Sequence, residues 1–114
     1  MLSEFLEFQV NVQLYHWRTH SHSRHEAAGE LYEDMTKLID EYMEVCMGKT
    51  SRRVALKKDT LNVKMYTHTS IITYLRGFLS FLENGLNTKD TSLLNIRDEM
   101  RAVLLRTLYK FTQR

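Results

Sequence analysis

The stretch that decides the fold runs from residue 25 to residue 48 and reads HEAAGELYEDMTKLIDEYMEVCMG. Apolar side chains recur in it every three or four residues, the spacing that places them along one side of an α-helix. The members of this stripe are Ala28, Leu31, Tyr32, Met35, Leu38, Ile39, Tyr42 and Cys46. The pattern predicts a long amphipathic helix from about His25 to Met47, which Gly48 ends in the left-handed conformation that glycine readily adopts.

The rest of the chain also favours helices. Its 114 residues include no proline and only four glycines, and they suffice for one small domain with its own core. Similar apolar stripes predict further helices at about 3–18, from 59 or 60 to 84, and from 90 or 91 onward. We therefore expect an all-α fold, a single four-helix bundle over residues 1–114. Residues 49–60, with a short helix at 54–56, would form the crossover between two parallel helices.

Several protein classes are disfavoured by the composition. No apolar run approaches the length of a membrane span, and no signal-peptide pattern opens the chain. The single cysteine, Cys46, lies on the apolar stripe and has no partner within the chain for a disulfide. These features predict a protein of a reducing compartment, the cytoplasm, without a membrane partner.

A second, polar side of the same helix carries the candidate site. At 100° per residue, Asp40 and Glu44 lie side by side and off the apolar stripe, and His25 and Gly29 flank the same side. His25 and Asp40 are fifteen residues apart, which is roughly 22 Å along one helix, so they cannot bind the same ion within one chain. Two copies packed antiparallel about a two-fold axis near Glu33 or Asp34 would bring His25 of one opposite Asp40 and Glu44 of the other.

Imidazole and carboxylate ligands together suit iron, manganese or zinc. His16, at the end of the preceding helix, could join such a site from the same side as His25. Two alternatives stay open. Four histidines, His16, His20, His22 and His25, could instead bind zinc or copper within one chain. The acidic side chains Asp40, Glu41 and Glu44 could also simply be solvated or paired with Lys37.

The order His16-Trp17, His25, Asp40, Glu44 resembles the ferroxidase motif of Dps proteins, the dodecameric mini-ferritins. The intervals from His25 to Asp40 and from Asp40 to Glu44 are those of that family. The run LYHWRTHSHSRHEAAGELY, with LIDEYMEV and GK after it, also resembles a small uncharacterised ferritin-like family met in large DNA viruses and phages. The chain departs from the Dps pattern in its shorter interval between His16 and His25.

A second departure is Gly29, which stands where Dps proteins have an aspartate that contributes to the iron site. Glycine inside a helix costs roughly 1 kcal/mol against alanine. Either a close approach of two helices across the dyad or the loss of a metal ligand would account for it. The resemblance implies that Gly29→Asp should speed iron oxidation and tighten metal binding.

The resemblance implies a ferritin-like bundle whose ligands are His16, His25, Asp40 and Glu44. Its substrate would be Fe(II), oxidised for detoxification or storage, with zinc or manganese as other metals for the site. Trp17 would lie near the metal, as a packing or redox-active residue. The assembly implied is a homo-oligomer, at least a two-fold dimer and a dodecamer in the complete family form, in the host cytoplasm or a virion. The alternative is a structural or interaction protein, virus-encoded in that case, that keeps the fold with a degenerate site.

Charge is segregated along the chain. Residues 19–47 carry two basic residues against seven acidic ones, whereas residues 48–60 carry five basic residues against one acidic one. The basic side chains Arg52, Arg53, Lys57 and Lys58 are the candidates for contact with phosphate groups. A solvated basic connector would have the same composition, so the sequence leaves nucleic-acid binding open.

Overall fold

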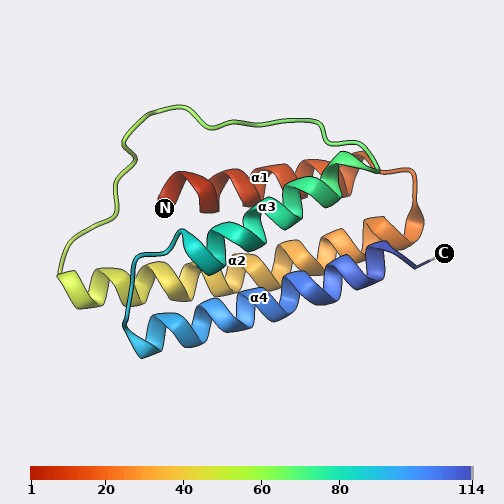
Figure 1. Ribbon diagram of the computed structural model, residues 1–114. Helices are drawn as coiled ribbons and strands as arrows, with labels where there is room; N and C mark the ends of the chain where they lie inside the picture. Colours follow the sequence, from red (N-terminus) through yellow and green to blue (C-terminus); the bar gives the residue numbers. More distant parts are fainter. Residues whose placement is uncertain (114) are drawn as a thin grey trace.

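Four helices make up most of residues 1–113, the part of the chain that the computed structural model describes. They are α1 (Leu2–Arg18), α2 (His22–Thr50), α3 (Ser70–Asn84) and α4 (Thr91–Phe111). Helices α1 and α2 are antiparallel neighbours, as are α3 and α4, and further contacts join α2 to α4 and α1 to α3 (Figure 1). The described residues contain no strand, so the all-helical prediction with four helices is confirmed. No described helix is both long and apolar enough to cross a bilayer.

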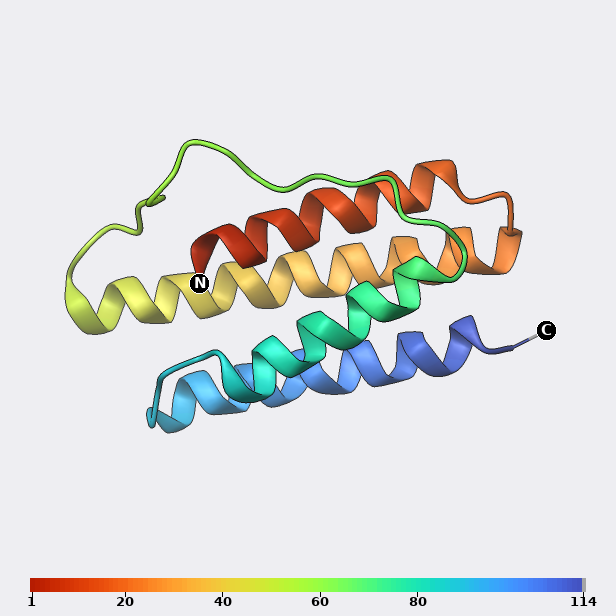
Figure 2. The same cartoon turned by 45° about the horizontal axis from the view of Figure 1, so that its top comes forward.

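Residues 51–69, here called the linker, connect α2 to α3. The linker runs back along the bundle past α1, so that α2 and α3 begin at the same end of the molecule and point in the same direction (Figures 1 and 2). The predicted crossover at 49–60 is therefore too short. The helix predicted at 54–56 is also wrong, because these three residues belong to no helix and are exposed.

Two side chains of α1 hold the linker in an extended conformation. The Asn62 backbone N–H donates to Glu7 Oε1 at 3.0 Å, and the Lys64 N–H donates to Asn11 Oδ1 at 2.9 Å. Asn11 Nδ2 also donates to the Asn62 carbonyl at 3.1 Å. These bonds use backbone groups that a helix from 59 or 60 would need for itself, and that predicted start is wrong by about ten residues. Thr67 and Ser70 then exchange side chain-to-backbone hydrogen bonds, which marks the true beginning of α3.

Helix α2 is longer than predicted at both ends. It begins at His22 because Ser21 caps it, with the Ser21 hydroxyl accepting from the Arg24 N–H at 3.3 Å. It ends at Thr50, and the residue in the left-handed conformation is Ser51, at φ 56°. Gly48 is helical, so its predicted role as the helix end is wrong.

Gly48→Ala is expected to stabilise the protein by about 0.5–1 kcal/mol. A Cβ at Gly48 would have no atom within 4 Å, and alanine restricts the unfolded chain more than glycine does. Chemical denaturation followed by circular dichroism measures the change. Gly85→Ala is the control, and it should destabilise, because its Cβ would lie 2.6 Å from Phe81 Cδ1 and 2.9 Å from the Phe81 carbonyl. A destabilised Gly48→Ala protein would show that this helical position requires glycine for a reason that its open surroundings do not reveal.

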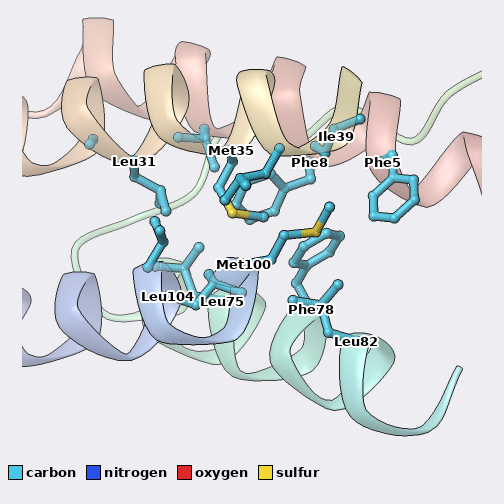
Figure 3. Packing of buried hydrophobic residues seen from close by; sticks show 14 of the residues in the cluster. Phe5, Phe8, Leu31, Met35, Ile39, Leu75, Phe78, Leu82, Met100 and Leu104 are labelled. Carbon is cyan, nitrogen blue, oxygen red and sulfur yellow. The ribbon is translucent and has the colours of Figure 1, made fainter. Parts of the chain in front are cut away.

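The core lies between the α1–α2 pair and the α3–α4 pair. In Figure 3, Leu31, Met35 and Phe8 point toward Leu104, Leu75 and Met100 from the opposite pair, and all six are buried. The predicted α2 stripe is confirmed apart from Tyr32 and Cys46, which are only half-buried. The polar side of α2, with the candidate site residues, is thus fixed away from the core.

Candidate metal-binding site

His16 in the last turn of α1 and His25 in the first turns of α2 form a stacked pair. Their ring centroids are 3.9 Å apart and their planes are inclined by 14°. His16 Nδ1 lies 2.6 Å from the His25 carbonyl oxygen, and His25 Nδ1 lies 2.6 Å from the His16 carbonyl oxygen. A carbonyl oxygen can only accept, so each Nδ1 carries a hydrogen and donates it.

This reciprocal bonding sets the chemistry of both rings. With Nδ1 protonated, a neutral imidazole keeps its free lone pair on Nε2, the atom that can bind a metal. A backbone carbonyl on the other ring nitrogen is also the usual partner of metal-bound histidine, where it fixes the tautomer and the ring orientation. His16 is half-buried and His25 exposed. The pair therefore presents two oriented donors near the surface.

Gly29 lies directly beneath the His16 ring. A Cβ built at Gly29 would come within 2.9 Å of His16 Cε1 and 3.3 Å of its Nδ1. Any larger residue would have to displace a ring that hydrogen bonds hold in place. The close approach that requires glycine therefore occurs within one chain, between α1 and α2.

Tyr15 and Arg24, the sequence neighbours of the two histidines, connect α1 and α2 at the same place on the core side. Arg24, only 6% exposed, donates from Nη1 to the Tyr15 hydroxyl at 3.1 Å and to the His68 carbonyl at 2.6 Å. Its Nη2 donates to the Phe111 carbonyl at 3.0 Å, and the guanidinium lies 4.7 Å from the centre of the Phe111 ring. Tyr15 and Arg24 thus join α1 and α2 on the core side, as His16 and His25 do on the outer side.

Our reasoning from the sequence missed Arg24, because it lies in the polar run THSHSR before the apolar stripe. One signal could have found it. Arg24 precedes Ala28 by four residues, which puts it in phase with the buried side of α2.

Asp40 and Glu44 lie further along α2, exposed and one turn apart. Hydrogen bonding to Asp40 and the negative charge of Asp40 raise the pKa of Glu44. A cation would relieve this repulsion between like charges. The spacing along the helix keeps Asp40 roughly 22 Å and Glu44 roughly 28 Å from His25, and no three His, Cys, Asp or Glu side chains of the described residues gather as a metal site.

The four-histidine alternative is wrong for this structure. His22 belongs to α2 and points into solvent, where its Nε2 lies 3.1 Å from Glu26 Oε1. His20 is exposed in the short turn between the helices, and the described residues hold no cluster of three or more such ligands. Only His16 and His25 are brought together.

Trp17 lies on an apolar stripe that we did not recognise in the sequence. Leu6, Val10, Leu14 and Trp17 recur every three or four residues on the side of α1 that faces away from the core. Trp17 is 67% exposed and Val10 39% exposed, whereas Leu6 and Leu14 are half-buried. Within one chain Trp17 therefore has little packing role.

The four basic side chains of the linker line two adjoining cavities. Arg52 and Arg53 line one at the end of α2, and Lys57 and Lys58 line the other beside the first turns of α1. Met1 and Val54 belong to both linings. All four side chains are exposed.

Comparison with known proteins gives one match. A family model described as "Family of unknown function (DUF5856)" matches residues 16–111, a range that begins at His16 and includes His25, Asp40 and Glu44. No curated protein and no solved structure matches the chain.

Proposed function

The chain belongs to the DUF5856 family of unknown function, and we propose that it is a Dps-like, iron-binding protein whose metal site is shared between two subunits. His16 and His25 of one subunit would bind Fe(II), together with Asp40 and Glu44 of the other. The observation that carries this proposal is the histidine pair, in which both Nδ1 atoms donate to carbonyls and both Nε2 atoms are left for a metal.

The donor set explains why a second subunit is needed. Two imidazoles leave most positions around a transition metal without a protein ligand, and the described residues of one chain bring no further ligand to them. Asp40 and Glu44 are exposed on the polar side of α2, which His25 and Gly29 flank several turns earlier. An antiparallel contact centred near Glu33 and Asp34 would place these carboxylates of one chain opposite the histidines of the other, twice per dimer.

The exposed stripe of α1 supports the same contact. Helix α1, which carries His16 in its last turn, has this stripe on its outer side: Leu6, Val10, Leu14 and Trp17. Isolated exposed apolar residues are common, but a row of two exposed and two half-buried ones on one side of a helix is typical of an interaction surface. In the proposed dimer this stripe is covered, and Trp17 gains a packing role beside the metal site.

The arrangement of the helices also supports a ferritin-like fold. An antiparallel pair, a long connection along the bundle, and a second antiparallel pair form the order of elements in ferritin-like proteins with one crossover (Figure 1). In the proposal the linker is that crossover.

In this role Fe(II) is the substrate. Two Fe(II) ions give up two electrons in becoming Fe(III). These electrons reduce one hydrogen peroxide, which takes up two protons and becomes two waters. Dioxygen is the alternative oxidant. The imidazoles favour Fe(II), while the hard carboxylate oxygens favour the Fe(III) product, which is then detoxified or stored. The same ligands also accept zinc or manganese.

A structural or interaction protein is the second candidate. It is favoured by Gly29, which removes a ligand of the Dps pattern, and by the apolar stripe, which suits a partner whether or not metal binds. In that case a dimer would form without any metal dependence at His16 and His25.

Mixing two variants tests the shared site. Asp40→Ala with Glu44→Ala removes the carboxylates, and His16→Ala with His25→Ala removes the imidazoles. Each variant alone should lose its metal, whereas mixed and reannealed subunits should regain one intact site per heterodimer. Co(II) titration followed by visible absorption, with oligomeric state measured by light scattering, reports both.

The matched control is Asp98→Ala with Glu99→Ala, which removes two exposed acids from α4, outside the proposed contact, and should leave binding unchanged. If mixing restores nothing while both variants are folded dimers, shared ligation is wrong. If the wild-type dimer binds no metal at all, the structural alternative holds.

A further inference from the structure

A cavity of about 360 Å³ opens at the end of the bundle where α2 ends and α4 begins. This is the end of α2 opposite the histidine pair (Figure 1). Tyr42, Cys46 and Met47 of α2 and Leu93 of α4 form one side of it, and Val54 of the linker and Met1 form another. These six apolar residues make up half of its lining. The other half is basic or polar: Lys49, Thr50, Arg52, Arg53, Asn87 and Thr88. The volume is within the range of sites for small molecules.

The entrance of this cavity is positively charged. Lys49, Arg52 and Arg53 line it and are exposed. Lys49 Nζ lies 3.4 Å from Asp90 Oδ2, but neither arginine forms an ion pair with any residue that the structure describes. The left-handed Ser51 turns the chain at the end of α2, and the Arg52 N–H donates to Thr50 Oγ1 at 3.3 Å. The backbone that carries the two arginines is therefore held next to the cavity.

We propose that this cavity binds a small amphipathic anion, a single carboxylate or phosphate group on a short aliphatic chain. Guanidinium groups bind both anions through paired charge-assisted hydrogen bonds. The aliphatic chain would lie against Tyr42, Met47 and Leu93, where burial of apolar surface contributes about 25 cal/mol per Å². A purely inorganic anion would leave the apolar lining unused, and a neutral lipid would leave the two arginines unused. This site does not depend on the proposed metal function.

Cys46 provides a specific probe, because it is the single cysteine of the chain and lines the cavity. The rate of its alkylation by iodoacetamide is measured with decanoate, decyl phosphate, decanol or decylamine, each below the concentration at which it forms micelles. Both anions should slow the reaction, and the preferred one identifies the headgroup. Decanol and decylamine should protect Cys46 about tenfold less well at equal concentration, the equivalent of one lost charge-assisted interaction.

Arg52→Gln with Arg53→Gln is the variant that tests the entrance. Calorimetric titration should show its affinity for decanoate reduced by about tenfold or more. Lys57→Gln with Lys58→Gln is the matched control, because it removes the same charge from the same linker but from residues that line only the adjoining cavity, and it should bind like wild type. All four positions are exposed, so both variants should fold as wild type does, which a thermal melt checks.

Three results would overturn the proposal. Equal protection by decanol would show that the anion is not recognised. An equal loss in the lysine variant would show general charge attraction rather than a site. Binding to anionic vesicles without any effect of the monomeric anions would assign these residues to a membrane surface instead.

Discussion

Replacing Arg24 by methionine is expected to lower the free energy of unfolding by about 3 kcal/mol. Methionine fills much of the volume but donates no hydrogen bond, so the Tyr15 hydroxyl and the carbonyls of His68 and Phe111 lose their partner. Each buried polar group left without a partner costs roughly 1 kcal/mol or more. The lost cation–π contact with the Phe111 ring adds to this.

Urea denaturation of both proteins, followed by circular dichroism, measures this difference. The control is Arg101→Met, which removes an arginine whose partner, Glu83, is also on the surface, and it should change stability by less than about 0.5 kcal/mol. Arg24→Lys should fall between the two, because it keeps the charge but loses the planar donor geometry. Equal effects of Arg24→Met and Arg101→Met would show that the buried network contributes nothing net.

The fold and the candidate site could be predicted from the sequence only in part. The repeat of apolar residues in α2 was enough to place its buried side, because one helix determines that pattern by itself. The start of α4 was also readable, since Asp90 caps it by accepting from the Leu93 N–H at 3.1 Å. The prediction that failed by most, the start of α3, depends on contacts between distant segments.

The linker is the clearest example. Its sequence, KKDTLNVKMYTHTS for residues 57–70, contains helix formers, and we predicted a helix from 59 or 60. The decisive groups are Glu7 and Asn11, which lie more than fifty residues earlier and bind the backbone of Asn62 and Lys64. Nothing in the local pattern reveals that partnership. A polar Asn in the middle of the α1 apolar pattern was the one available signal.

The histidine site was likewise predictable in part. Spacing alone predicted that His16 and His25 would approach from the same side, and the structure brings them together. Spacing could not show that their rings stack, that each Nδ1 donates to the other residue's carbonyl, or that Gly29 makes room for His16. These details depend on the crossing of α1 and α2 at one turn.

Gly29→Asp is therefore expected to weaken metal binding, contrary to what the resemblance to Dps proteins implies. The new Cβ would lie 2.9 Å from His16 Cε1, so the His16 ring must leave its bond to the His25 carbonyl. Loss of such a supporting hydrogen bond typically reduces metal affinity by about 10- to 100-fold. Co(II) titration and stopped-flow oxidation of Fe(II) by peroxide should both show the loss.

Two further variants separate the steric effect from the charge. Gly29→Ala adds the Cβ alone and should weaken binding about as much as Gly29→Asp. Gly77→Asp adds the same carboxylate to α3, where a Cβ meets no atom within 4 Å, and should leave affinity unchanged. If Gly29→Asp instead bound metal more tightly while Gly29→Ala bound it less tightly, the new carboxylate would be acting as a ligand. The His16 ring would then have its present position only in the metal-free protein, and metal binding would move it.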